Sequence, residues 1–386
     1  MLLANGDIYF DYNATTPIDP WVLEAMQIYL STSFGNPSSN HSMGNRNRAA
    51  IEEARAQVAN LLGCEPGEII FTSGGSESNN LALKGLAAKY AHRGMHIIVS
   101  AVEHPSIIEV CHYLTREGFR VSYLPVDDQG VVSSQDLSTI ITSKTILVSV
   151  MHANNEVGSI QPISELADIA HEAGAVFHTD AAQSVAKIPT RVDELKCDLL
   201  TVAGHKLYAP KGIGALFLKK GTQLAPLIHG AGQEGGLRAG TENVAYIVGL
   251  GKAAEVANET LQEEMKKIKI LRDILQSDLK KAFPEIRINA SKVDRLPNTL
   301  SISFPNISAL QIMDNLKGLA ISAGAACHSG DGKGSGVLEA MGVDLNYQLG
   351  TLRLSLGRFV DEYQVKRAVE IVQIVQNKLA NSQKSN

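Results

Sequence analysis

The stretch DLLTVAGHKLYAPKGIGALFLK, residues 198–219, combines two apolar runs with a polar turn between them. Residues 199–202 predict one strand and residues 213–218 a second. Between them lie Gly204-His205-Lys206 and a loop rich in proline and glycine. Because α/β folds bind ligands where their strands end, a lysine directly after a buried strand places its amine at such a site. Lys206 is therefore a candidate Schiff-base former, although a lone loop lysine is more often an ordinary surface residue.

A carboxylate follows a second apolar run, and it changes that balance. The sequence AVFHTD at residues 175–180 predicts a strand that ends at Asp180. A carboxylate at such a position is costly to bury unless a cation faces it. Enzymes that use pyridoxal phosphate (PLP) pair an aspartate with the protonated ring nitrogen and a lysine with the aldehyde carbon. Asp180 and Lys206 fit this pair.

Length and composition limit the class of protein. A chain of 386 residues is too long for one small core and predicts two domains, or a large domain with a smaller companion. The net charge of -5 offers no basic patch, so nucleic acid is not an expected partner. No apolar run approaches the ~20 residues that span a bilayer. The first residues, MLLANGDIYFDYN, do not resemble a signal peptide, and we expect a cytoplasmic enzyme.

Strands and helices alternate from about residue 68 to residue 179, which is typical of parallel βαβ units in a sheet covered on both faces. The ligand should then lie along the carboxyl ends of the strands. Polar residues follow each of the later strands at this edge: Glu103-His104, His152 to Glu156, Asp180 to Gln183, and His205-Lys206. This recurrence supports a site more strongly than any single motif does.

Two glycine-rich segments need separate interpretations. Ser73-Gly74-Gly75-Ser76 lies between a short strand and a helix, where backbone N–H groups at a positive helix end hold phosphate. A plain N-cap by Ser76 would give the same pattern. Residues 230–235 formally contain GxGxxG, but no clear strand precedes them and no helix follows directly, so we reject a dinucleotide site and expect a flexible loop.

The four cysteines form no CxxC pair, so neither a zinc site nor a disulfide framework is expected. Cys64, Cys111 and Cys197 stand beside apolar residues and are most simply packed thiols. Cys327 differs, because it lies in a loop of small residues with five glycines from position 324 to 336. An accessible thiol that can ionise is reactive, and beside a PLP site an incidental loop cysteine becomes the less favoured interpretation.

The motifs together resemble a known family. They are DYNATTP, SGGSESNN, Glu103-His104, HANNEVG, HTDAAQS, GHKLYAPKGIGAL, RAGT, AGAACHSG and RLSLGRF, and they are similar to the cysteine desulfurases of the NifS/IscS type in the class V aminotransferase group. The resemblance covers nearly the whole chain. It implies a PLP-dependent transferase of fold type I and a homodimer with shared active sites.

The resemblance also implies the domain organisation. A large domain at residues 15–258 would carry a mainly parallel seven-stranded sheet and bind PLP. A smaller α/β domain, residues 1–14 and 259–386, would carry the mobile cysteine loop at about 323–336. The long helical stretch after Glu242 would join the two.

Roles at the cofactor follow from the resemblance residue by residue. Lys206 would bond to PLP and move the substrate's Cα proton, while Asp180 would hold the ring nitrogen and Gln183 the ring hydroxyl. His104 would stack on the ring and assist proton transfer. The phosphate would be held by Gly75, Ser76, His205 and, from the other subunit, Thr241. Ala203 replaces a serine found in many relatives, so one phosphate contact is expected to be missing.

The remaining residues concern the substrate. Asn155 would contact the cofactor and, with Arg353, hold the substrate carboxylate, Arg353 through a bidentate pair. Cys327 would accept sulfur from L-cysteine as a persulfide, releasing L-alanine, and pass it to an acceptor protein such as an iron–sulfur scaffold. No metal is expected.

Four alternatives remain open from the sequence. The loop AGAACHSG is also similar to that of selenocysteine lyases, so L-selenocysteine is a second candidate substrate. A C–S lyase that forms pyruvate would use Lys206 and Asp180 without Cys327, and a plain aminotransferase would leave the cysteine loop without a role. A non-catalytic, partner-binding relative would be expected to have lost cofactor residues, which this chain retains.

Overall fold

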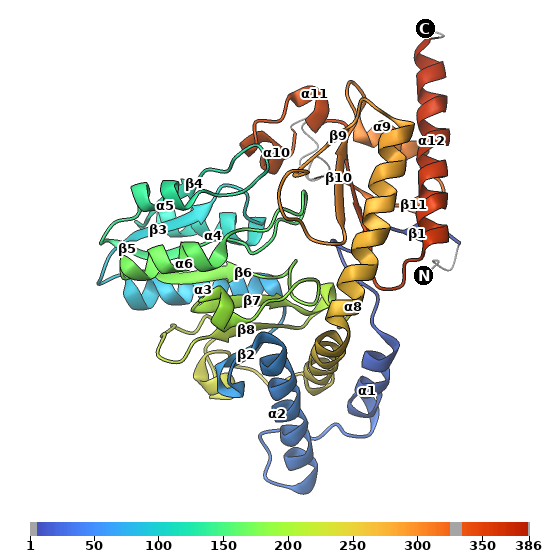
Figure 1. Cartoon of the computed structure of the whole chain (residues 1–386). Helices are drawn as coiled ribbons and strands as arrows, with labels where there is room; N and C mark the ends of the chain where they lie inside the picture. The colour runs from blue at the N-terminus through green and yellow to red at the C-terminus, as the bar shows by residue number, and fades with distance from the viewer. Residues whose placement is uncertain (1–5, 325–333, 385–386) are drawn as a thin grey trace.

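The structure, a computed structural model, describes residues 6–324 and 334–384. Its largest feature is a seven-stranded sheet (Figure 1). Strands β3 to β7 pair in parallel, and β8 pairs antiparallel with both of its neighbours. The expected mainly parallel sheet is thus confirmed. In order across the sheet the strands are β2 (Ile69–Thr72), β8 (Gly214–Leu218), β7 (Leu199–Ala203), β6 (Val176–Asp180), β5 (Thr145–Ser149), β3 (His96–Ser100) and β4 (Arg120–Leu124).

Both faces of this sheet are covered, as alternate residues of β3 show. Ile97 and Val99 pack in one apolar cluster with residues of two helices, while Ile98 packs in a second cluster with residues of several others, including a second pair. Strands buried on both faces need continuous apolar sequence, which is why β3 and β5 read as unbroken apolar runs. The first pair of helices is α3 (Gly75–Tyr90) and α4 (Pro105–Arg116), and the second is α2 (Ser42–Leu62) and α6 (Ile163–Glu172).

A four-stranded antiparallel sheet forms a second unit, in the order β12 (Ser322–Ala323), β13 (Thr351–Ser355), β10 (Thr299–Ser303) and β9 (Arg287–Ile288). Residues 319–323 do not form one continuous strand. The chain divides at Ile321 into β11 (Leu319–Ala320) and β12, because the first part pairs with β1 (Ile8–Tyr9) and the second with β13. The N-terminal segment therefore joins this unit.

Helix α8 (Val244–Ala282) connects the two units over 39 residues. It contacts α1 (Pro20–Ser31) and α2 near its start and α12 (Glu362–Lys384) near its end (Figure 1). The boundary expected near residue 258 lies inside this continuous helix, so the proposed domain ranges stay a prediction. The shorter helices are α5 (Ser134–Ile140), α7 (Val192–Leu195), α9 (Ala309–Asn315), α10 (Gly336–Ala340) and α11 (Leu345–Gln348).

Candidate active site

A cavity of about 330 Å³ opens at the carboxyl ends of the parallel strands. Segments from distant parts of the chain meet there, including the start of α3, the turn after β7 and strand β13. Most of the residues expected from the sequence line it: Gly75, Ser76, His104, Asn155, Asp180, Gln183, His205, Lys206 and Arg353. The fold thus brings these residues together in one cavity at the strand ends.

Lys206 and Asp180 end neighbouring elements of the large sheet. Asp180 is the last residue of β6, and Lys206 closes a 3-10 turn, η2 (Gly204–Lys206), that directly follows β7. Asp180 is 6% exposed, and its two oxygens accept hydrogen bonds from Asn79 Nδ2 (2.8 Å) and from the Ala182 N–H (2.9 Å). These donors hold the carboxylate in one orientation.

Burial lowers the pKa of Lys206 from the usual 10.5; Asp180 opposes this shift and Arg353 adds to it. A lower pKa increases the fraction of the neutral amine, which is the nucleophilic form of lysine. Lys206 therefore lies in an environment suited to attack on a carbonyl carbon.

The start of α3 forms an anion-binding edge of the cavity. Its N-cap, Gly74, has φ 150° and ψ -179° and supplies no side chain to the first-turn amides. Glu77, the acidic residue of this first turn, accepts instead from Arg238 Nε (2.9 Å) and from the Ser73 N–H (2.8 Å). A Cβ on Gly75 would lie 3.2 Å from Ala203 Cβ, so glycine allows the helix start to approach β7 closely. N–H groups at a positive helix end attract phosphate.

His205 lines the same cavity and has an uncharged ring. Its Nδ1 is 3.1 Å from Thr15 Oγ1, and burial, reinforced by Lys206, lowers the pKa of His205 to about 4. The ring is therefore uncharged at neutral pH.

His104 caps α4 and is connected to Asp180 through two further side chains. The Ser106 N–H donates to His104 Nδ1 (3.1 Å), and Ser106 Oγ lies 2.8 Å from the same atom. Asn79 Nδ2 donates to Ser106 Oγ and to Asp180 Oδ2, both at 2.8 Å. Because Nδ1 accepts, the neutral imidazole carries its proton on Nε2.

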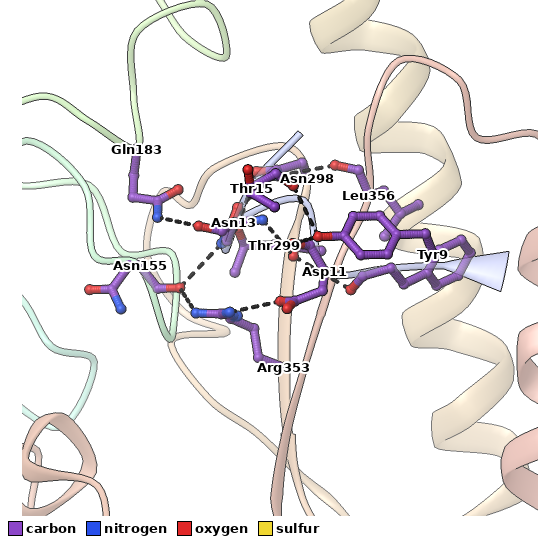
Figure 2. A network of polar contacts seen from close by, with 12 residues as sticks. Tyr9, Asp11, Asn13, Thr15, Asn155, Gln183, Asn298, Thr299, Arg353 and Leu356 are labelled. Atoms are coloured by element: carbon purple, nitrogen blue, oxygen red, sulfur yellow. Dashed lines mark hydrogen bonds and ion pairs between the residues drawn. The ribbon is translucent and has the colours of Figure 1, made fainter. Parts of the chain in front are cut away.

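Arg353, 8% exposed, brings a cation from β13 to the cavity. Its Nη1 donates to the backbone carbonyl of Asn155 (3.0 Å), and its Nη2 donates to Asp11 Oδ1 (2.8 Å) (Figure 2). Among the described residues, Nε has no hydrogen-bond partner although it is buried. Asn155 thus meets Arg353 through its main chain, while its side-chain amide extends away from Arg353 in Figure 2.

Three positions singled out in the sequence, Thr241, Cys327 and Ala203, add no side-chain group to this cavity among the described residues. Thr241 lines a different surface hollow with Arg238 and Gly240, so its role at the other subunit's phosphate stays a prediction. Cys327 lies outside the described residues. Ala203 lines the cavity beside Gly75 without a hydroxyl.

The expected flexible loop at residues 230–235 contains part of a short 3-10 turn, η3 (Gln233–Gly236), in which Arg55 pairs with Glu234 through two hydrogen bonds. Across residues 6–324 and 334–384, no helix is long and apolar enough to cross a membrane. No group of three or more His, Cys, Asp or Glu side chains in those same ranges is placed to hold a metal ion.

The structure adds cavity residues to which the sequence assigned no role. Asn79 belongs to SGGSESNN and lies one helical turn after Gly75, so helical spacing was an available signal. Asn13 belongs to DYNATTP, far from the other site residues in sequence, and only the fold brings it into the cavity.

Fold and site together define an α/β enzyme built around a half-buried lysine and a buried carboxylate at adjacent strand ends. Comparisons with known proteins identify the family of this enzyme. Residues 8–368 match the model of the family described as aminotransferase class-V. The cysteine desulfurase IscS of Dictyoglomus turgidum is 45% identical over 375 residues, covering 97% of this chain and 95% of its own length.

Two solved structures agree with this match. A NifS-like protein superimposes with a TM-score of 0.90 at 39% identity and covers 96% of this chain and 99% of its own. SspA in complex with cysteine gives a TM-score of 0.80 at 37% identity and covers 92% and 99%. The chain belongs to the aminotransferase class-V family, and within it to the cysteine desulfurases of the NifS/IscS type. Its family is one of PLP-dependent enzymes.

Proposed function

We propose that this enzyme binds PLP in the Lys206 cavity, converts L-cysteine to L-alanine and transfers the sulfur to Cys327 as a persulfide. The observation that carries the proposal is the pair of strand ends where half-buried Lys206 and buried Asp180 line one cavity with the start of α3. If Lys206 were an ordinary surface lysine and the start of α3 only a helix cap, there would be no reason for the two to line one cavity with Asp180.

The residues present fit PLP in charge and in hydrogen bonding. Asp180, fixed by Asn79 and Ala182, is an acceptor for a protonated ring nitrogen. The amides of Gly75 and Ser76 and the neutral ring of His205 suit a phosphate. Arg353 has a buried Nε without a partner among the described residues, which suits an anionic group of the ligand.

When bound, PLP supplies an electron sink for the negative charge that develops at the substrate Cα. Lys206, with its lowered pKa, accepts and returns the Cα proton. Asp180 supplies the carboxylate that pairs with the protonated ring nitrogen. Arg353 binds the substrate carboxylate, with Asp11 and the Asn155 carbonyl orienting its guanidinium. His104, with its proton on Nε2, is oriented to assist proton transfer.

The transfer of sulfur needs one thiol of the chain, that of Cys327. The Cys327 thiolate attacks the substrate sulfur, an S–S bond forms, and the Cβ–S bond of cysteine breaks. The electron pair of that bond stays on Cβ, Cβ takes up the one proton that the Cys327 thiol released, and the carbon skeleton leaves as L-alanine. The persulfide then passes to an acceptor protein such as an iron–sulfur scaffold. We further propose a homodimer in which the partner subunit's Thr241 completes the phosphate site.

Product analysis tests this proposal. Purified protein is incubated with L-cysteine and a reductant, and alanine and pyruvate are quantified for wild type, Cys327→Ala and Lys206→Ala. We expect alanine from wild type, loss of turnover by a factor of at least ~100 without Cys327, and loss of both turnover and the yellow absorbance without Lys206. Pyruvate as the main product, or turnover that does not need Cys327, would instead indicate an elimination lyase.

A further inference from the structure

Asn13, from the N-terminal segment, is 1% exposed and lines the cavity. Its backbone N–H donates to Ser355 Oγ (2.9 Å), and its backbone carbonyl accepts from Gln183 Nε2 (3.0 Å). Through these two bonds Asn13 connects the segment after β1 to the Gln183 amide in the cavity and to Ser355 on β13.

The side chain of Asn13 is equally occupied. Its Oδ1 accepts from Lys187 Nζ (3.1 Å) and from Asn298 Nδ2 (2.9 Å). Its Nδ2 donates to Thr299 Oγ1 (2.8 Å) and to the backbone carbonyl of Asn155 (3.2 Å). A lysine amine donates and a backbone carbonyl only accepts, so the network fixes which end of the Asn13 amide faces which partner.

The partners of Asn13 come from both units of the molecule. Gln183 and Lys187 follow β6 of the large sheet, and Lys187 Nζ also donates to Gln183 Oε1 (2.8 Å). Thr299 and Ser355 belong to β10 and β13 of the smaller sheet. Asn13 therefore lies between the two units at the cavity wall (Figure 2).

Asn155 connects this network to the cation of the cavity. Its backbone carbonyl accepts from Asn13 Nδ2 and also from Arg353 Nη1, so one oxygen serves both donors (Figure 2). Since a carbonyl oxygen has two lone pairs, this pair of bonds saturates it. A displacement of the Asn155 main chain would move the Arg353 guanidinium with it.

We propose that Asn13 is a positioning residue, which holds the Asn155 carbonyl and through it orients Arg353 for the carboxylate of the amino-acid substrate. The inference rests on the proposed function only in taking an α-amino acid as the ligand. It predicts an effect on substrate binding, separate from the Lys206 and Asp180 side of the cavity.

Asn13→Asp removes the donor side of the amide and keeps the acceptor side. Aspartate retains an oxygen for Lys187 and Asn298, but it replaces the nitrogen that donates to Asn155 and Thr299 with a second oxygen. We expect the KM for L-cysteine and the dissociation constant of L-alanine, measured by spectral titration without turnover, to rise about tenfold through the loss of the hydrogen bond to the Asn155 carbonyl. We expect kcat to change less than about threefold and the PLP content to stay that of wild type.

Asn289→Asp is the matched control. Asn289 is fully buried and donates to Ser301 Oγ (3.1 Å) and Ser303 Oγ (2.9 Å), away from the cavity. It should lose stability without a change in KM. If Asn13→Asp does not accumulate, Asn13→Ala is measured in its place. A KM and an L-alanine affinity within twofold of wild type, or an equal rise in the control, would overturn the inference. A wild-type protein that neither binds L-alanine nor consumes L-cysteine would instead overturn the proposed function.

Discussion

Glu103 is a buried carboxyl group next to His104 that the proposed chemistry does not use. It is 7% exposed, and its Oε1 accepts from Ser100 Oγ (2.6 Å) and from the Met151 N–H (2.7 Å). Its Oε2 is buried without a partner among the described residues. Burial, with Asp180 adding to it, raises the pKa of Glu103 from 4.5 to about 8. The folded chain therefore keeps this carboxyl protonated at neutral pH.

This raised pKa predicts a dependence of stability on pH. Between pH 4.5 and about 8 the unfolded chain has released a proton that the folded chain retains. The free energy of unfolding should then fall by about 1.4 kcal/mol for each pH unit of increase across this window, and level off above it. Glu103→Gln removes the titration, so its stability relative to wild type should rise from pH 5 to pH 8. Urea unfolding at four pH values measures both proteins, and parallel curves would contradict the raised pKa.

Single residues differ in how far the sequence alone could assign them. Lys206 and Asp180 follow apolar runs directly, so their positions at strand ends were predictable. Asn13 and Lys187 have no such local pattern. Their contacts join residues 285 and 174 positions apart, and no local propensity specifies a pairing of that range.

Gly74 is the N-cap of α3, and its backbone conformation shapes the helix start that we propose binds the phosphate. Its φ of +150° is a backbone conformation that residues with a Cβ rarely adopt, although a Cβ there would meet no atom within 4 Å. Gly74→Ala should therefore cost on the order of 1–3 kcal/mol of stability and displace the start of α3. We expect about tenfold weaker binding of PLP and little change for pyridoxal, which lacks the phosphate, both measured by fluorescence titration.

The control for this prediction is Gly67→Ala. Gly67 lies in open space in the 3-10 turn η1 (Pro66–Glu68) and has no positive φ. Its replacement should change stability by less than ~0.5 kcal/mol and leave PLP binding unchanged. An equal loss of pyridoxal binding in Gly74→Ala would show that the substitution disturbs more than the phosphate edge.

Helices and strands were predictable from the sequence where the spacing of their apolar residues specifies them without reference to distant parts of the chain. The long helical stretch predicted after Glu242 is α8, which begins at Val244. The antiparallel direction of β8 and the division of the strand near Ile321 were not predictable, because apolar runs look alike whichever neighbour they pair with.

Across the whole molecule, Arg358 joins four parts of the chain around the lysine turn. Its Nη1 lies 2.7 Å from Asp19 Oδ2 at the start of α1, and its Nε lies 2.9 Å from Glu264 Oε1 on α8. The guanidinium is 4.2 Å from the ring centroid of Tyr208, which follows Lys206 by two residues. The Arg358 side chain is 8% exposed, and those of Asp19 and Glu264 are 7% and 18% exposed. Removal of Arg358 would therefore leave two largely buried carboxylates without this cation.

We expect Arg358→Met to lower the free energy of unfolding by about 3–5 kcal/mol, because breaking a buried ion pair strands the remaining charges. Arg358→Lys should lose less, since it keeps the charge but not the planar contact with Tyr208. The control is Arg367→Met, whose pair with Glu370 is 48% and 58% exposed and should matter by less than ~1 kcal/mol. Urea unfolding compares all three with wild type. If Arg358→Met is as stable as the control, the buried carboxylates must be accommodated without Arg358, and the two units must be joined mainly by the apolar contacts of α8.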